Sequence, residues 1–345
     1  MRYVEAGGVR LSAIGLGTWQ FGSPEWGYGS QYASEEARKI ILRAIELGIN
    51  LIDTAEIYGM GKSEKIIGEA LSGVSSAGSP GSSGMTHISQ NGSCASLRDK
   101  VFLATKVFPL VPLAPIVEQR AVASARRLQT DRIDLYQVHW PNPVFPLAST
   151  MSGMRKLVDQ GTVVNVGVSN FPLARWQEAE RFFRGPVLTN QVRYNLVDRR
   201  PEAELLPWAQ ANQRIVIAYS PLAQGFLSAK YGPGNRPKGA ARAGNPLFLE
   251  ENLQRGVTMF EVLRNIAKSH DATPSQVALA WLVRHPNVVV IPGASSVEQL
   301  ERNAAAADLE LTDQDDYSLR EASDAFIPSG GVKTLPKMIR ARLGL

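Results

Sequence analysis

The chain has 345 residues, long enough for one large domain or two ordinary ones, and its composition excludes several classes of protein. Its 44% hydrophobic and 20% charged residues are typical of a soluble globular protein. Cys94 is the single cysteine, which excludes an internal disulfide and any metal site built from several cysteines. The net charge of +5 is spread along the chain and argues against nucleic-acid binding.

The N-terminal segment, MRYVEAGGVRLSAIGLG, lacks the basic start and the long apolar run of a secretory signal. No apolar stretch reaches the length that a membrane-spanning helix needs. A single cysteine also suits a reducing compartment. We therefore expect a cytoplasmic protein with no membrane partner.

Short β-rich apolar runs alternate with longer amphipathic segments along most of the chain. A small hairpin is expected first, formed by Arg2–Ala6 and Val9–Ala13. The eight expected strands that follow are Ile14–Thr18, Asn50–Asp53, Val101–Lys106, Ile133–His139, Val163–Val168, Val187–Gln191, Ile215–Tyr219 and Val288–Pro292. Helical patterns between them include Ser34–Gly48, Ser63–Leu71, Ala114–Leu128, Pro172–Arg184 and Pro274–Arg284.

This alternation determines the expected fold class. Strands that alternate with helices must pair in parallel, with the helices as crossovers. Eight strands at intervals of about 25–50 residues suit a closed barrel better than an open doubly wound sheet. The sequence therefore predicts an α/β chain that forms one (β/α)8 TIM barrel domain over residues 1–345, preceded by the hairpin.

Two stretches interrupt the alternation. Ser72–Leu97 is rich in Ser and Gly, so we expect a flexible surface insertion at about 72–97, away from the chemistry because it follows a helix. Ala223–Asn252 follows a barrel strand, and a long loop at that end is typically a lid or a binding loop. A C-terminal tail is expected at about 326–345. Whether it covers the barrel mouth, joins a partner subunit or stays mobile is left open by its sequence.

Polar residues stand at the C-terminal ends of three consecutive expected strands, where barrel enzymes carry their active sites. Asp53 ends the second strand with Tyr58 just beyond it, Lys106 ends the third, and His139 ends the fourth. Taken singly, Asp53 and Lys106 are compatible with a structural ion pair, and His139 with an ordinary core histidine. Their convergence on one mouth favours a catalytic site.

The four side chains suit proton transfer to a carbonyl oxygen. A phenol with an ordinary pKa near 10 is a weak acid at pH 7. We expect the ammonium group of Lys106 to lower the pKa of Tyr58, and Asp53 to keep that lysine charged. His139 can hold the substrate oxygen or share the proton. The set contains no activated nucleophile and no metal cage.

Other motifs do not support a competing chemistry. Tyr58 and Lys62 have the Y-x-x-x-K spacing of short-chain dehydrogenases, but the two glycines between them predict a loop instead of the helix that this chemistry needs. No glycine-rich dinucleotide fingerprint follows the first strand. His87, His270 and His285 lack the spacing of metal ligands, so we expect no metal site and place these histidines on the surface.

Several separated motifs resemble the aldo-keto reductase family, in order and over nearly the whole chain. They are GLGTWQFG, INLIDTAEIYGMGKSEKIIGEAL, DKVFLATKV, RIDLYQVHWP, VGVSNF, NQVRYN, AYSPLAQG and IPGASSVEQLERN. The resemblance implies a barrel enzyme that moves hydride between a nicotinamide cofactor and a carbonyl. The family's catalytic tetrad of Asp, Tyr, Lys and His matches Asp53, Tyr58, Lys106 and His139.

The resemblance also implies a cofactor site and a substrate pocket. The implied cofactor-binding residues are Gly17, Thr18, Trp19, Asp53, Ser169, Asn170, Gln191, Tyr219, Ser220, Pro221, Leu222, Gln224, Gly225, Gly293, Ser295, Gln299 and Asn303. Among them, Ser169, Asn170 and Gln191 match the residues that hold the nicotinamide carboxamide, and Tyr219 matches the aromatic that stacks on the ring. The pocket for an apolar or flat substrate is implied to consist of Trp19, Tyr58, His139 and Trp140.

The choice of cofactor depends on two positions. Many family members place Lys or Arg at the positions of Gly293 or Gln299 to bind the 2′-phosphate of NADP, whereas this chain has neither there and Arg302 lies close in sequence. Branches that resemble NADP users also have Gly, Ser and Gln at these positions. We therefore expect NADP(H) and favour NAD(H) less.

The leading hypothesis is NADPH-dependent reduction of an aldehyde or ketone, with the proton from Tyr58. Two alternatives stay open: NAD(P)-dependent oxidation of a polyol or sugar by the same residues, and a channel-regulatory subunit that acts as a redox sensor. The chain shows no extended N-terminal arm before the hairpin, which disfavours the channel subunit. The sequence indicates neither the particular carbonyl substrate nor the oligomeric state.

Overall fold

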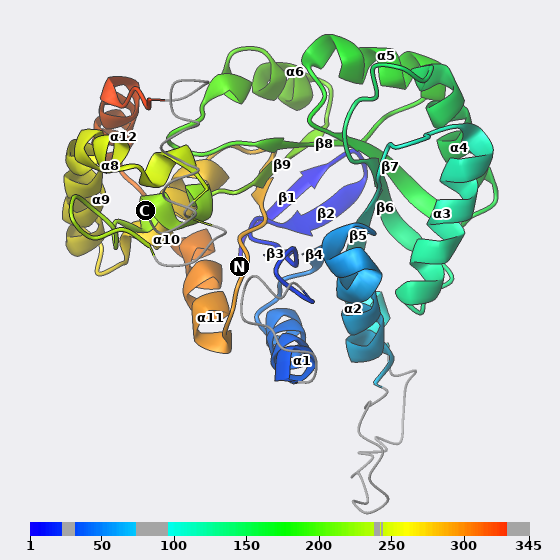
Figure 1. Cartoon of the computed structure of the whole chain (residues 1–345), viewed down its shortest axis with the longest axis horizontal. Coiled ribbons are helices and arrows are strands. Elements are labelled where there is room, and N and C mark those ends of the chain that lie inside the picture. Colours follow the sequence, from blue (N-terminus) through cyan, green and yellow to red (C-terminus); the bar gives the residue numbers. More distant parts are fainter. Residues whose placement is uncertain (23–31, 74–95, 238–241, 243, 330–345) are drawn as a thin grey trace, which may run out of the picture.

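The computed structural model describes residues 1–22, 32–73, 96–237, 242 and 244–329 and forms a parallel barrel (Figure 1). Its strands are β3 (Leu16–Gly17), β4 (Leu51–Asp53), β5 (Phe102–Val107), β6 (Ile133–Val138), β7 (Val163–Ser169), β8 (Thr189–Arg193), β9 (Ile215–Tyr219) and β10 (Val288–Val290). Each strand pairs in parallel with the next one in the chain. Backbone N–H groups of Gly15 and Gly17 donate to the carbonyls of Val290 and Pro292 and close the sheet between β3 and β10. The expected (β/α)8 barrel is confirmed.

Helices surround the strands, as Figure 1 shows. They are α1 (Tyr32–Glu46), α2 (Lys62–Ser72), α3 (Ala114–Arg127), α4 (Leu147–Asp159), α5 (Leu173–Phe183), α6 (Leu205–Ala211), α8 (Glu250–Arg255), α9 (Val257–Ser269), α10 (Pro274–Val283), α11 (Val297–Ala305) and α12 (Asp313–Ala325). Local signals set some of their ends: Thr273 and Gln276 form a capping box at the start of α10, where Pro274 takes the first position. Within the described residues, no helix combines the length and the apolar character needed to cross a bilayer.

A hairpin closes the N-terminal end of the barrel. Its antiparallel strands are β1 (Tyr3–Ala6) and β2 (Val9–Ser12), close to the expected bounds. Val4 and Leu11 belong to one buried cluster with the strand residues Leu51 and Ile217. The backbone N–H of Ser12 donates to the side-chain oxygen of Asn50, directly before β4, at 2.7 Å. The hairpin therefore packs against the ends of the strands that lie opposite the expected active site.

Some expected boundaries differ from those in the structure. The first and last barrel strands are shorter than expected, because Pro292 has no N–H to donate and the chain turns after Gly17. The segment expected as one long loop, Ala223–Asn252, begins with a 3-10 turn at Ala223–Ser228 and ends inside α8. Most of the expected insertion at 72–97 and residues 330–345 of the expected tail lie outside the described residues.

Candidate active site

Asp53 and Lys106 form a buried ion pair inside the barrel. The Nζ atom of Lys106 lies 2.5 and 2.6 Å from the two carboxylate oxygens of Asp53, and it also donates to the backbone carbonyl of Thr54 at 2.8 Å. The exposed fractions of the two side chains are 0% and 2%. The residues lie on the neighbouring strands β5 and β4, whose parallel register brings both side chains to the same end of the barrel.

The ion pair keeps Lys106 protonated. Burial alone would lower the pKa of this lysine, but the Asp53 carboxylate and Tyr58 raise it, and the net pKa lies above the ordinary value of 10.5. A permanent positive charge is therefore present at the bottom of the site across the physiological pH range.

Tyr58 is directed towards that charge by the turn that follows β4. Its hydroxyl accepts a hydrogen bond from Lys106 Nζ at 3.4 Å. Tyr58–Gly61 is a 3-10 turn in which Gly59 and Met60 have left-handed φ angles of 56° and 57°. Tyr58 and Lys62 are therefore not held on one regular helix, as the two glycines predicted.

The pKa of Tyr58 corrects one of our expectations. Burial raises this pKa and the charge of Lys106 lowers it, and the net value lies above the ordinary 10.0. We expected a lowered pKa, which is wrong because the loss of solvation outweighs the attraction of the ammonium group. The phenol therefore keeps its proton at neutral pH, and the ammonium group of Lys106 lies where it would stabilise a phenolate.

His139 follows β6 and forms another side of the site. Its ring meets the Tyr58 ring edge-on with centroids 5.9 Å apart, and it stacks on Trp140 at 3.9 Å. Burial, together with the charge of Lys106, lowers the pKa of His139 to about 2. The imidazole is therefore neutral, and its buried Nδ1 atom has no hydrogen-bond partner within the described part of the chain. A neutral ring suits holding a ligand through a hydrogen bond rather than storing a proton.

Gln191 on β8 binds the tetrad directly. Its side-chain amide donates to both carboxylate oxygens of Asp53, at 3.1 and 2.9 Å. The family resemblance places this residue at the nicotinamide carboxamide, whereas the structure shows its N–H groups directed at Asp53. The two residues are 138 positions apart, and periodicity in the sequence gives no signal for such a contact.

The residues expected around the nicotinamide lie side by side at the ends of three strands. The Ser169 hydroxyl donates to the backbone carbonyl of Gln191 at 2.9 Å. The Asn170 side chain donates to the backbone carbonyl of His139 at 3.2 Å and accepts from the Tyr219 hydroxyl at 2.9 Å. This chain of bonds fixes the Tyr219 ring beside the tetrad, as an aromatic that stacks on a planar ligand would require.

The loop after β9 adopts an unusual backbone. Left-handed φ angles occur at Ser220, Ala223, Gln224 and Gly225, with values of 49°, 48°, 58° and 97°. Non-glycine residues rarely adopt this conformation, so other contacts must hold them in it. Asn195 donates to the Ser220 carbonyl at 2.9 Å, and Asn245 donates to the Gln224 side chain at 3.0 Å. Sequence reasoning missed the role of both asparagines: Asn195 ends the motif NQVRYN but was given no role, and no motif marks Asn245.

The segment between β10 and α11 completes the other side of the mouth. The Ser295 hydroxyl and backbone N–H both donate to the Gln299 side chain at 2.9 Å, and Asn303 donates to the Gly293 carbonyl at 3.3 Å. A Cβ atom at Gly293 would lie 2.7 Å from the terminal amide of Gln20, so a larger residue here would require the Gln20 side chain to move. The N-terminus of α11, next to these residues, suits an anionic group.

Two residues expected to bind the cofactor make structural contacts. The Thr18 side chain is fully buried, and its hydroxyl donates to the Asp53 carbonyl at 2.8 Å. Gly17 closes the barrel, and a Cβ atom there would lie 2.6 Å from the Ile291 carbonyl oxygen. Trp19, which follows Thr18, is 49% exposed at the mouth.

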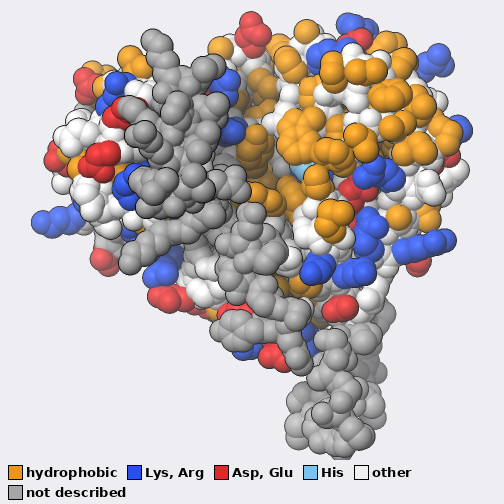
Figure 2. Space-filling model, in the orientation of Figure 1, with side chains coloured by type: hydrophobic (Ala, Val, Ile, Leu, Met, Phe, Trp, Pro, Cys, Tyr) orange, Lys and Arg blue, Asp and Glu red, His pale blue; other side chains and the backbone are white. Residues whose placement is uncertain are grey.

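Exposed apolar side chains form a rim along one side of the mouth. Hydrophobic side chains gather around a hollow on the face shown in Figure 2. The exposed large apolar residues on the loops after β3, β4, β5 and β6 are Trp19, Ile57, Met60, Leu110, Val111, Trp140 and Val144. Phe108 joins this rim to the tetrad, since its ring packs edge-on against both His139 and Trp140.

Comparison with known proteins agrees with this geometry. The sequence profile of the "Aldo/keto reductase family" matches residues 13–324. An uncharacterised oxidoreductase of Mycobacterium tuberculosis is 50% identical over 344 residues, 99% of each chain, and a methylglyoxal reductase of Escherichia coli is 38% identical, with 89% of each chain covered. A solved aldo/keto reductase from Klebsiella pneumoniae, in complex with NADP and acetate, is 32% identical with a TM-score of 0.69 and covers 95% of this chain and 96% of its own. The chain belongs to the aldo/keto reductase family.

Proposed function

We propose that this protein reduces an aldehyde or ketone to an alcohol with NADPH and that Tyr58 donates the proton. The observation that carries the proposal is a protonated phenol held 3.4 Å from a permanently charged lysine, beside a neutral histidine. This arrangement suits a carbonyl oxygen that gains negative charge as it is reduced.

The residues around the mouth fit a nicotinamide dinucleotide. Ser169, Asn170 and Tyr219 would hold the nicotinamide, the left-handed loop after β9 would lie along the phosphates, and the start of α11 would face the adenosine end. The bound dinucleotide supplies the hydride. Two solved Klebsiella pneumoniae relatives, 32% and 31% identical, carry NADP and NADPH, which supports NADP(H) for this chain.

The protein's own residues manage the proton. Tyr58 releases its proton to the carbonyl oxygen, and Lys106 stabilises the phenolate that remains. Asp53 keeps Lys106 charged, and Gln191 holds Asp53. His139 orients the substrate oxygen as a neutral hydrogen-bonding group. Burial holds on Tyr58 the proton that reduction needs, and the same residue would act as the base in the reverse reaction.

The cofactor preference needs a direct comparison of NADPH with NADH. A NADH-specific methylglyoxal reductase of Escherichia coli is 32% identical over 330 residues, so both cofactors occur among relatives. We expect a smaller KM for NADPH with the same aldehyde. A smaller KM for NADH would overturn this part of the proposal.

Replacing Tyr58 by phenylalanine tests the proton donor. Tyr58→Phe should lower kcat by about a hundredfold to ten-thousandfold while the affinity for NADPH, measured by fluorescence quenching, stays the same. Tyr136→Phe is a matched control, because the Tyr136 hydroxyl is buried and has no hydrogen-bond partner among the described residues. That variant should keep its activity. Equal turnover by wild type and Tyr58→Phe would exclude the assigned role.

A further inference from the structure

Arg193 places a positive charge at the barrel mouth, outside the tetrad. It is the last residue of β8, two positions after Gln191, and alternate residues of a strand point to the same face. Gln191 reaches into the barrel to Asp53, so Arg193 lies on that same face about 7 Å closer to the mouth. In the β8–β9 register it is paired with Tyr219, the ring expected to stack on the nicotinamide.

The charge of Arg193 is available to a ligand. Arg193 is exposed, and its side chain makes no hydrogen bond or ion pair within the described chain. Arg200, which lines the same cleft, is different: its guanidinium group donates to both carboxylate oxygens of Asp198, each at 2.7 Å. Of these two arginines, Arg193 alone is therefore ready to receive an anion.

A cleft of about 490 Å³ adjoins Arg193. Its lining combines Arg193 and Tyr219 with the apolar side chains of Leu173, Pro201 and Leu205. This volume lies within the usual range for small-molecule sites, which are mostly apolar with a few placed polar groups. Such a lining suits a compact apolar body that carries one charged group.

We propose that Arg193 selects carbonyl substrates that carry a carboxylate, which it binds in this cleft while the carbonyl group faces Tyr58. The inference rests on the proposed reductase function. A guanidinium group binds a carboxylate through two parallel hydrogen bonds, which fixes orientation as well as charge. Glu204 also lines the cleft, and its negative charge disfavours a second anionic group. The expected substrates are therefore monocarboxylates rather than dicarboxylates or phosphate esters.

A pair of aldehydes that differ only in one carboxylate tests this inference. Arg193→Gln should lower kcat/KM for 4-carboxybenzaldehyde by about 10- to 100-fold, mainly through KM, and should change kcat/KM for benzaldehyde by less than about twofold. Arg193→Lys, which keeps the charge but loses the planar fork, should give an intermediate value for 4-carboxybenzaldehyde. Arg200→Gln is the matched control and should preserve the ratio between the two aldehydes.

Benzoate binding to the enzyme–NADP complex, measured by calorimetry, tests the anion site without turnover. Benzoate should bind to wild type and bind at least about tenfold more weakly to Arg193→Gln. An unchanged affinity, or an unchanged ratio between the aldehydes, would overturn the inference. So would a weaker affinity for NADPH with both aldehydes slowed equally, because the anion would then be a cofactor phosphate. Benzoate binding through Arg193 in a protein that reduces no aldehyde would support the anion site and contradict the proposed function.

Discussion

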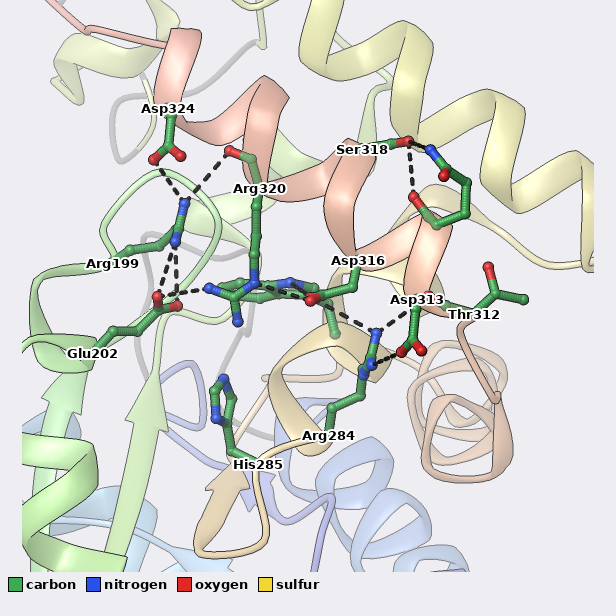
Figure 3. A network of polar contacts seen from close by, with 12 residues as sticks. Arg199, Glu202, Arg284, His285, Thr312, Asp313, Asp316, Ser318, Arg320 and Asp324 are labelled. Carbon is green, nitrogen blue, oxygen red and sulfur yellow. Dashed lines mark hydrogen bonds and ion pairs between the residues drawn. The ribbon is translucent and has the colours of Figure 1, made fainter.

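Two charged networks in this molecule are built differently. In the barrel, one cation serves several acceptors, since Lys106 donates to Asp53, to the Thr54 carbonyl and to Tyr58, and it is fully buried. A second network lies outside the barrel and joins α12 to the segment after β8 and to the end of α10 (Figure 3). There the exposed fractions of Arg199, Glu202 and Arg320 are 19%, 19% and 32%.

The outer network spreads its charge over many partners. Glu202 accepts from Arg199, from Arg320 and from the Tyr194 hydroxyl, and Arg320 also binds Asp316. Water and alternative partners can compensate when one of these groups is lost, as at most partly exposed ion pairs. The Asp53–Lys106 pair in the barrel is closed off from water and cannot exchange partners in this way. The neighbouring His139 keeps one buried nitrogen without a hydrogen-bond partner among the described residues. The contrast teaches that the barrel concentrates its charge on one fully buried ion pair, whereas the outer network shares its charge among partly exposed groups that connect separate elements.

The largest effect is expected from breaking the barrel pair. Lys106→Met leaves the Asp53 carboxylate buried without its counter-charge, with only the Gln191 amide still donating to it, which should cost about 3–5 kcal/mol in the free energy of unfolding. Turnover should fall by about a hundredfold or more because the phenolate of Tyr58 loses its stabilising charge. Urea denaturation and NADPH oxidation measure the two effects.

The double variant Asp53→Asn, Lys106→Met separates the effect on stability from the effect on turnover. Removing both charges should restore most of the stability but none of the turnover. Equal stability of Lys106→Met and the double variant would show that the Asp53 carboxylate carries no desolvation cost when Lys106 is absent.

A smaller effect concerns the pH dependence of stability. The folded-state pKa of His139, about 2, lies below its ordinary value of 6.5, so only the unfolded chain gains this proton as the pH falls below 6.5. The associated stability is present above that pH and is lost below it, by about 1.4 kcal/mol per pH unit. His139→Gln should therefore flatten the decline between pH 6.5 and 5, as urea titrations at several pH values would show.

His285 offers a comparison within the outer network. Burial is the largest cause that lowers its pKa, so His285→Gln should also flatten the decline, but less, because Glu202 and Asp316 partly offset that burial. A larger effect at His285 than at His139 would contradict the contrast between the two regions.

The smallest effect is expected at Glu202. Burial alone would raise the pKa of this carboxyl, but the hydrogen bonds from Arg199 and Tyr194 lower it, and the net value lies below the ordinary 4.5. The stability it contributes is present above pH 4.5 and is lost as the pH falls through the lowered pKa. Glu202→Gln should lower the melting temperature at pH 7 by about 2–4 °C with a smaller loss at pH 4. Its kcat/KM should stay within about twofold of wild type, and a tenfold loss would show that the outer network serves catalysis.

Much of the fold and part of the candidate site were accessible from the sequence. Parallel strands present their C-terminal ends at one face, so apolar runs that end in Asp53, Lys106 and His139 already predict that these side chains meet. The pKa of Tyr58 was not accessible, because its sign depends on how burial compares with a nearby charge.

Long-range partners were also not accessible. Gln191 meets Asp53 across 138 positions, and Asn195 holds a carbonyl in a loop that no short motif links to it. His285 was expected on the surface, but it is partly buried and its Nε2 atom lies 2.9 Å from the Tyr194 hydroxyl. Such contacts depend on the packing of whole elements, which local patterns do not specify.

The hairpin packs across the N-terminal end of the barrel, so ligands reach the site from the C-terminal mouth. In the proposed reaction, the substrate, the product and the cofactor all have to pass this mouth, and a proton donated by Tyr58 has to be replaced from the same side. A flat molecule that covered Trp19 and Trp140 at the rim would block the mouth and slow the exchange of substrate and cofactor together.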